Sequence, residues 1–167
     1  MKPAPDAAAW AAFPGLAWRV ARFDDLSVHE LQNIFMARQQ VFVVEQACAY
    51  LDADGGDETA FHLAAWSTAQ RAPLAYARVV DPGVKYAEAS IGRVLTTTAG
   101  RGCGLGREVV RRAIAQAGAA WPGTRIRISA QSRLVSFYVG FGFWTAGPEY
   151  LEDGIPHTEM LLAAAAH

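Results

Sequence analysis

Hydrophobic and polar residues alternate in short stretches along the chain, and each such stretch predicts a β-strand. The stretches that fit this pattern are residues 18–23, 61–66, 74–80, 90–97, 125–130, 141–143 and 157–162. Apolar residues at helical intervals follow a capping box of Ser27 and Glu30, and they recur after residue 106 and within residues 134–139. This order predicts an α/β (α+β) fold, with a mixed central sheet of about six to seven strands and helices on both of its faces.

The length of the chain predicts one domain. The chain has 167 residues, a size that folds around a single hydrophobic core. Residues 1–15 are rich in Ala and Pro, so we expect a flexible leader there and a single domain over residues 16–163.

Charge and cysteine content narrow the range of partners. The formal net charge is -1, whereas nucleic-acid binders usually carry a strong basic excess. No apolar run is long enough to span a membrane. Cys48 and Cys103 are too few for a disulfide framework and lack the spacing of metal ligands. We therefore expect a cytoplasmic protein without a metal and without nucleic-acid or membrane partners.

A glycine-rich segment is the most informative part of the chain for function. It lies between an expected strand and an expected helix and consists of Arg101, Gly102, Cys103, Gly104, Leu105, Gly106 and Arg107. Alternating glycines permit a sharp turn that exposes successive N–H groups, and the positive end of the following helix adds to an anion site suited to a diphosphate. A tight turn without a ligand is the alternative interpretation.

Two common phosphate-binding motifs do not match this segment. A P-loop requires Gly-Lys followed by Ser or Thr, and the chain has no Lys after Lys85. A dinucleotide fingerprint requires a third glycine where Arg107 stands, or where Val109 stands if the motif starts two residues later. Both of these ligand classes are therefore excluded.

Two motifs in sequence order resemble the GNAT acetyltransferase superfamily. The first is Arg101, Gly104 and Gly106, and the second is Tyr138, Gly142 and Phe143. Residues 38–57, 91–94 and 152–157 are similar to the ElaA-type subgroup, and the resemblance extends over residues 18–160. It implies the GNAT fold, in which two parallel strands, here 90–97 and 125–130, splay apart. It also implies acetyl-CoA as the co-substrate.

The resemblance implies that several residues contact the coenzyme. Backbone groups of Val94, Leu95 and Thr96 are expected to contact its pantetheine arm and to stabilise the developing oxyanion. Residues 101–107 are expected to hold the diphosphate. Gln131 stands where many GNAT sequences carry a coenzyme-contacting Asn.

Three side chains are candidates for the chemistry. Tyr138 matches the tyrosine that protonates the departing thiolate, and a tyrosine pKa near 10 keeps the proton in place at neutral pH. Glu45 and His157 are candidate bases, because an amine acceptor is mostly ammonium at neutral pH. We expect direct transfer of acetyl to a primary amine, either a small molecule or a peptide. The resemblance also allows a homodimer.

Three arginines stand in otherwise apolar surroundings, where an unpaired charge is costly. These are Arg38, Arg78 and Arg93, and the candidate partners are Glu45, Asp52, Asp54 and Asp57. We expect internal pairing, and recognition of an acceptor carboxylate is the alternative. The acidic turn at residues 52–57 lacks the order of ligands in an EF-hand, so we expect it to be stabilised by Asx hydrogen bonds.

Two other functions remain open from the sequence. The segment 38–57 also resembles acyl-homoserine-lactone synthases, GNAT relatives that take acyl chains from a carrier protein. A binding module that senses acetyl-CoA without turnover is the second alternative.

Overall fold

A seven-stranded sheet forms the centre of the computed structural model, which describes residues 10–164. The strands are β1 (Ala17–Arg22), β2 (Ala60–Trp66), β3 (Ala75–Val80), β4 (Ala89–Thr96), β5 (Ile126–Gln131), β6 (Trp144–Glu152) and β7 (Ile155–Leu162). Their order across the sheet is β1-β2-β3-β4-β5-β7-β6, with β4 and β5 parallel and all other neighbours antiparallel. This mixed sheet confirms the predicted fold class.

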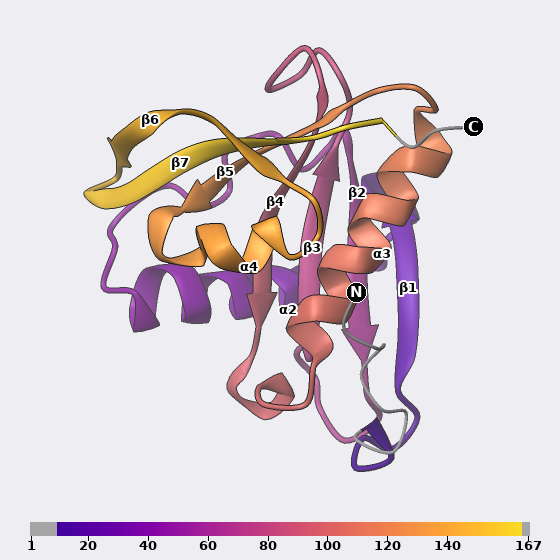
Figure 1. Cartoon of the computed structure of the whole chain (residues 1–167). Coiled ribbons are helices and arrows are strands. Elements are labelled where there is room, and N and C mark those ends of the chain that lie inside the picture. The colour runs from indigo at the N-terminus through magenta and orange to yellow at the C-terminus, as the bar shows by residue number, and fades with distance from the viewer. Residues whose placement is uncertain (1–9, 165–167) are drawn as a thin grey trace.

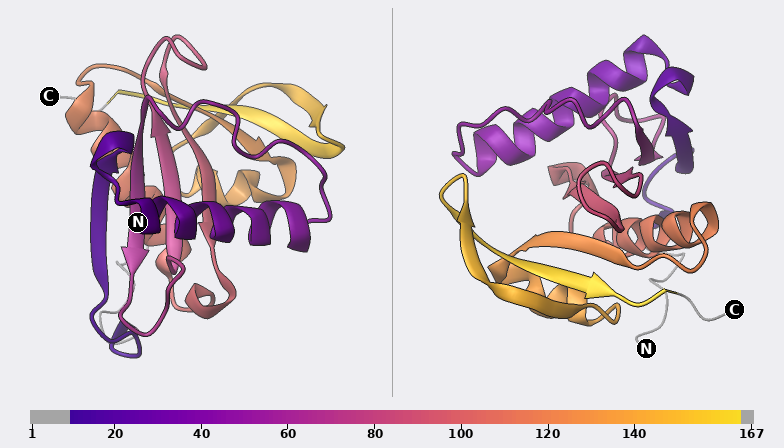
Figure 2. Two further views of the ribbon diagram at one scale, coloured as in Figure 1. Left: turned by 180° about the vertical axis from the view of Figure 1, so that it is seen from behind. Right: turned by 90° about the horizontal axis from the view of Figure 1, so that it is seen from above.

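The helices cover both faces of the sheet, as predicted. They are α2 (Val28–Arg38), which continues as a π-helical segment (Gln39–Glu45), α3 (Leu105–Ala120) and α4 (Val135–Val139). Helix α2 lies on one face, whereas α3 and α4 lie on the other (Figures 1 and 2). The capping box that starts α2 is present, since the Glu30 amide donates to Ser27 Oγ and the Ser27 amide donates to Glu30 Oε2.

Each face has its own core. The apolar side of α3, including Leu105, Val109 and Val110, is fully buried against strands of one face. Burial of each such side chain contributes on the order of 1.5–3 kcal/mol to folding. Ile34 of α2 packs with Tyr76 and other residues on the opposite face. These two cores hold the sheet between the helices.

The parallel pair β4 and β5 separates after a short contact. Pairing is confined to Ala89 with Ile126 and Ser90 with Arg127. A bulge interrupts the pairing of β4 with β3, and Arg93 in this region has a φ of 52°. The splayed strand pair implied by the resemblance is therefore present.

The predicted strand at residues 141–143 is wrong. The amides of Phe141 and Phe143 both donate to the carbonyl of Tyr138, so this segment closes the end of α4 as a turn. Gly142 has a φ of 94° in this turn, which an L side chain rarely adopts. The strand β6 begins only at Trp144 and extends to Glu152.

The acidic turn and the chain before β1 both contact the domain. The Gly56 amide donates to Asp54 Oδ1, which is the expected Asx hydrogen bond.

Trp10 and Phe13 pack against the core cluster of α3, and Trp10 Nε1 donates to the carbonyl of Cys103 at 3.1 Å. Residues 1–9 of the expected leader lie outside the described residues. No helix within residues 10–164 has the length and apolar character needed to cross a bilayer.

Candidate active site

The separation of β4 and β5 opens a cavity of about 730 Å³. On the side that faces β5, β4 has no strand partner from Ile91 onward, and β5 has none on its β4 side from Ile128 onward. The backbone N–H and C=O groups on these two edges are therefore open to an extended ligand. Val94, Leu95 and Thr96, which were expected to contact the pantetheine arm, all line the cavity.

The glycine segment forms a loop in which the amides of residues 102–106 are free. Gly102 and Gly104 have φ values of 78° and 83°, and Gly104 caps the start of α3 without a side-chain hydrogen bond. Within the described part of the chain, the amides of residues 102–106 donate to no oxygen. A row of free amides at the positive end of a 16-residue helix suits a diphosphate. The observed loop thus fits the coenzyme that the sequence implies.

The loop is positioned by its neighbours. Gly100 lies so close to β3 that an added Cβ would sit 2.3 Å from the carbonyl oxygen of Leu74. The Trp10 side chain binds the carbonyl of Cys103, and the Cys103 thiol lies 3.2 Å from the carbonyl of Gly100. The guanidinium of Arg107 stacks over the rings of Phe137 and Phe141, at 5.7 and 5.1 Å from their centroids. The loop is therefore fixed before any ligand binds.

Two side-chain bridges join the π-helical segment to the walls of the cavity. Arg101 Nη2 lies 2.5 Å from Glu45 Oε2, and Arg101 Nε donates to the carbonyl of Thr96. Gln131 Nε2 donates to Gln46 Oε1 at 2.9 Å. Arg101, expected to bind the diphosphate, and Glu45, expected to act as a base, are thus paired with each other.

Tyr138 lies on α4 and lines the cavity. The ring is buried, and it makes edge contacts with Phe137 and Phe143 at centroid distances of 5.1 and 5.9 Å. Burial raises the pKa of Tyr138 to about 12, so the phenol retains its proton at neutral pH. The hydroxyl makes no hydrogen bond within residues 10–164 and is free to donate to a ligand.

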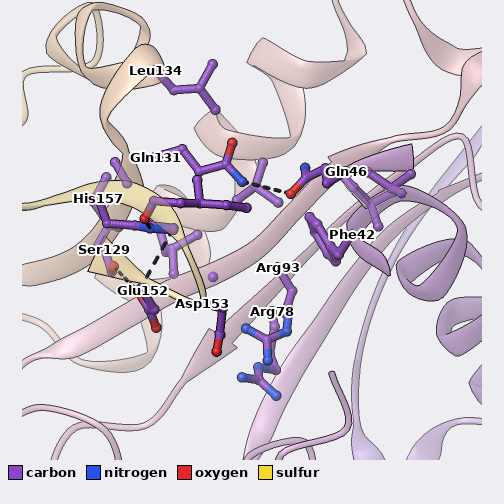
Figure 3. Close-up of a pocket in the computed structure, with 18 of the residues that line it drawn as sticks. Phe42, Gln46, Arg78, Arg93, Ser129, Gln131, Leu134, Glu152, Asp153 and His157 are labelled. Atoms are coloured by element: carbon purple, nitrogen blue, oxygen red, sulfur yellow. Dashed lines mark hydrogen bonds and ion pairs between the residues drawn. The ribbon is translucent and has the colours of Figure 1, made fainter. Parts of the chain in front are cut away.

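His157 lies on β7, next to Gln131 in the register of β5. Its Nδ1 is 2.7 Å from the carbonyl of Ile155, and because a carbonyl can only accept, Nδ1 carries the proton. The neutral imidazole therefore has a lone pair on Nε2, which lies 4.0 Å from Glu152 Oε2. Figure 3 shows His157 and Glu152 on one side of the pocket and Gln46 and Phe42 on the opposite side.

The three arginines of interest pair internally, as expected. The buried Arg38 binds Asp52 and Asp57, Arg78 binds Asp54 and Asp57, and Arg93 binds Asp52 and Asp54. Burial by itself raises the pKa of Asp57, but hydrogen bonds and the charges of Arg38 and Arg78 outweigh this effect and lower it. Three cations and three carboxylates therefore form a formally neutral cluster.

The structure brings most of the expected site residues together. Glu45, Arg101, Gln131, Tyr138 and His157 all line the cavity. Residues 102–107 do not line it, although they directly follow Arg101.

Sequence reasoning missed three residues at this site. Gln46, Ser129 and Glu152 all line the cavity, and Ser129 hydrogen-bonds to Glu152. Each comes from a different element, so only the folded sheet brings them together. The Asp-Gly turn that follows Glu152 was visible in the sequence, and it was the available signal that Glu152 lies at a hairpin end.

Comparisons with known proteins agree with this geometry. A family model described as "Acetyltransferase (GNAT) domain" matches residues 28–164. A UPF0039 protein of Synechocystis is 43% identical over 144 residues, which cover 86% of this chain and 93% of that protein. Protein ElaA of Escherichia coli is 35% identical over 147 residues, which cover 87% of this chain and 95% of ElaA.

A solved structure shares the fold closely. The crystal structure of an acyl-CoA N-acyltransferase from Pseudomonas aeruginosa superposes with a TM-score of 0.84 and 39% identity, and the match covers 89% of this chain and all of that one. The fold implies an acyl-CoA co-substrate and an acceptor for the acyl group. The chain belongs to the GNAT acetyltransferase family, in its ElaA-like group, and is an acyltransferase enzyme.

Proposed function

We propose that this enzyme transfers an acetyl group from acetyl-CoA directly to a primary amine. The observation that carries the proposal is the cavity between the unpaired edges of β4 and β5, which Tyr138 and His157 both line. An extended pantetheine arm, with its amide groups, matches such strand edges.

The glycine loop supports binding of the coenzyme diphosphate. The free amides of residues 102–106 point to an anion site at the start of α3. Arg101 adds a charge at the rim once it leaves Glu45. Gln131 is proposed to contact the coenzyme once its amide leaves Gln46.

The open edge of β4 supports stabilisation of the reacting carbonyl. The bulge near Arg93 changes the pairing of β4 just before Val94, Leu95 and Thr96. We propose that a backbone amide of this segment donates to the acetyl oxygen as negative charge develops there. Because this donor belongs to the sheet, it needs little reorganisation during the reaction.

The acceptor loses a proton and the leaving group gains one. His157 Nε2 accepts a proton from the ammonium, and the amine nitrogen bonds to the acetyl carbonyl carbon. The C–S bond then breaks as Tyr138 donates its proton to the departing sulfur, and the nitrogen releases its second proton to the Tyr138 phenolate, which leaves a neutral amide and restores the phenol. Glu45 is the second candidate base, since its carboxylate is released when Arg101 turns to the diphosphate.

A donor assay tests this function against the alternatives. We expect acetyl-CoA, together with an amine panel, to release free thiol and acetylated amine. Transfer only from acyl carrier protein would instead support an acyl-homoserine-lactone-synthase-like enzyme. Tight acetyl-CoA binding with no transfer to any amine would support a sensor.

The two cysteines Cys48 and Cys103 are free, which supports the proposed reducing, cytoplasmic setting.

A further inference from the structure

The wall formed by β5, β6 and β7 carries a carboxylate without a basic partner. Within the described residues, no Lys or Arg lies within salt-bridge distance of Glu152. Its titratable neighbours are His157, with Nε2 4.0 Å from Glu152 Oε2, and Tyr150, whose hydroxyl is joined to Glu152 through Ser129. Its side chain is 41% exposed and lines the cavity. The mechanism above does not use this group.

A hydrogen-bonded chain fixes the position of Glu152. Ser129 Oγ lies 2.7 Å from Glu152 Oε2 and 2.5 Å from the hydroxyl of Tyr150. Because an ionised carboxylate can only accept, Ser129 donates its one proton to Glu152 and accepts from Tyr150. These contacts hold the carboxyl group of Glu152 at the cavity, with Oε2 4.0 Å from Nε2 of His157.

The paired arginines Arg78 and Arg93 are not available to form an ion pair with a carboxylate on the acceptor. Arg78 and Arg93 line the cavity, but both are neutralised by Asp52, Asp54 and Asp57. A second carboxylate near them would have to displace an existing partner, which would leave a largely buried charge unpaired.

Two cations that line the cavity have no carboxylate partner within residues 10–164. Arg133 lies in the turn after β5 and donates to Gln131 Oε1 at 3.0 Å. Lys85 is exposed on the connection between β3 and β4, with its Nζ 5.3 Å from the ring centroid of Tyr86. Because Arg133 is engaged by Gln131, Lys85 is the cation of this pair that offers an alternative site for an acceptor carboxylate.

We propose that Glu152 binds the ammonium group of the acceptor, and that the acceptor is an alkylamine or diamine with no carboxylate beside the reacting nitrogen. This inference rests on the proposed acetylation of amines. The ammonium forms a charge-assisted hydrogen bond with Glu152 and then gives one proton to His157. The α-carboxylate of an amino acid would lie next to Glu152 and be repelled by it.

A matched pair of acceptors tests the inference in the unmodified enzyme. Pentane-1,5-diamine and L-lysine differ by one carboxylate. We expect the diamine to be acetylated with a kcat/KM at least about tenfold above that for the lysine α-amine, with the lysine product being the Nε-acetyl form. Acetylation of the α-amine at a rate equal to the diamine overturns the inference and leaves the proposed function intact.

Two single-residue variants test whether Glu152 binds the ammonium group of the acceptor. Glu152→Gln keeps the hydrogen bond with Ser129 and removes the charge, so we expect the KM for the diamine to rise on the order of 10- to 100-fold. The Kd for acetyl-CoA and the melting temperature should not change. Lys85→Ala is the control and should change the KM less than about twofold. An unchanged KM in Glu152→Gln, or a large effect of Lys85→Ala, overturns the assignment.

Another result would overturn both proposals together. If acetyl-CoA binds but neither diamine nor lysine is acetylated, the proposed amine transfer fails, and this inference fails with it.

Discussion

Arg101 and Glu45 form an ion pair, with Arg101 Nη2 2.5 Å from Glu45 Oε2, across 56 residues of sequence. This contact joins the first residue of the glycine loop to the end of the π-helical segment that lines the cavity. The side chains are 44% and 28% exposed, so solvent weakens the pair. Binding of a diphosphate by Arg101 therefore requires an exchange of one anionic partner for another.

We expect Glu45→Gln to tighten acetyl-CoA binding by roughly two- to fivefold, because Arg101 no longer has to leave a carboxylate. Isothermal titration calorimetry measures the Kd. Arg101→Ala is the matched variant and should weaken binding on the order of tenfold. Weaker binding by Glu45→Gln would contradict the exchange, and tighter binding combined with lost turnover would identify Glu45 as the base.

Tyr138→Phe should lower kcat on the order of 100-fold, because the departing thiolate loses its proton donor. The Kd for acetyl-CoA should remain the same. The hydroxyl has no hydrogen bond within the described residues, so the melting temperature should also be preserved. Thiol release under saturating acetyl-CoA measures kcat, and an unchanged value would remove Tyr138 from the chemistry.

The kcat/KM should fall as the pH decreases, because a protonated His157 Nε2 cannot accept a proton from the acceptor. We expect His157→Gln to lower kcat/KM on the order of 100-fold and to abolish this acidic limb of the pH profile. Glu45→Gln serves as the comparison and should keep the limb. If the limb survives in His157→Gln and disappears in Glu45→Gln, the base is Glu45.

The free energy of unfolding should decrease as the pH falls below about 6.5. His62 is buried, with Nε2 bonded to the carbonyl of Asp57 and Nδ1 bonded to the hydroxyl of Tyr76, so its neutral form is satisfied. Burial lowers the pKa of His62, so below about pH 6.5 the unfolded chain binds a proton that the folded one resists. We expect the free energy of unfolding, measured in urea, to fall by up to about 1.4 kcal/mol per pH unit in this range.

The acid effect should continue at lower pH. Although burial raises the pKa of Asp54 and Asp57, their bonds with Arg78 and Arg38 lower both values overall, so stability present above about pH 4 is lost as these groups protonate. A free energy of unfolding that is constant between pH 7.5 and 5.5 would contradict the assignment to His62.

Gly100→Ala should destabilise the fold by about 1–3 kcal/mol, because its Cβ would meet the Leu74 carbonyl oxygen at 2.3 Å. Gly118→Ala is the control. Gly118 lies inside α3 with nothing within 4 Å of an added Cβ, so the substitution should stabilise the helix by roughly 0.5–1 kcal/mol. Chemical denaturation measures both, and equal effects would show that contact with β3 does not determine the conformation of the coenzyme loop.

Local patterns were sufficient to predict most of the elements. The capping box of Ser27 and Glu30, the glycines before α3 and the alternating strands all depend on neighbours within a few residues. The error at residues 141–143 arose because two aromatic residues favour a strand locally, whereas Gly142 and the carbonyl of Tyr138 make the segment a turn at the end of α4.

The sequence by itself determined the α/β order of elements, the glycine loop with its free amides, and the resemblance to GNAT enzymes. Only the tertiary structure decided the environment of each charge. It paired Glu45 with Arg101, neutralised Arg78 with aspartates, and left Glu152 without a cation. The physical reason is that the energy of a charge depends on distances to groups far away in the chain, and such distances follow from the packing of the sheet and helices.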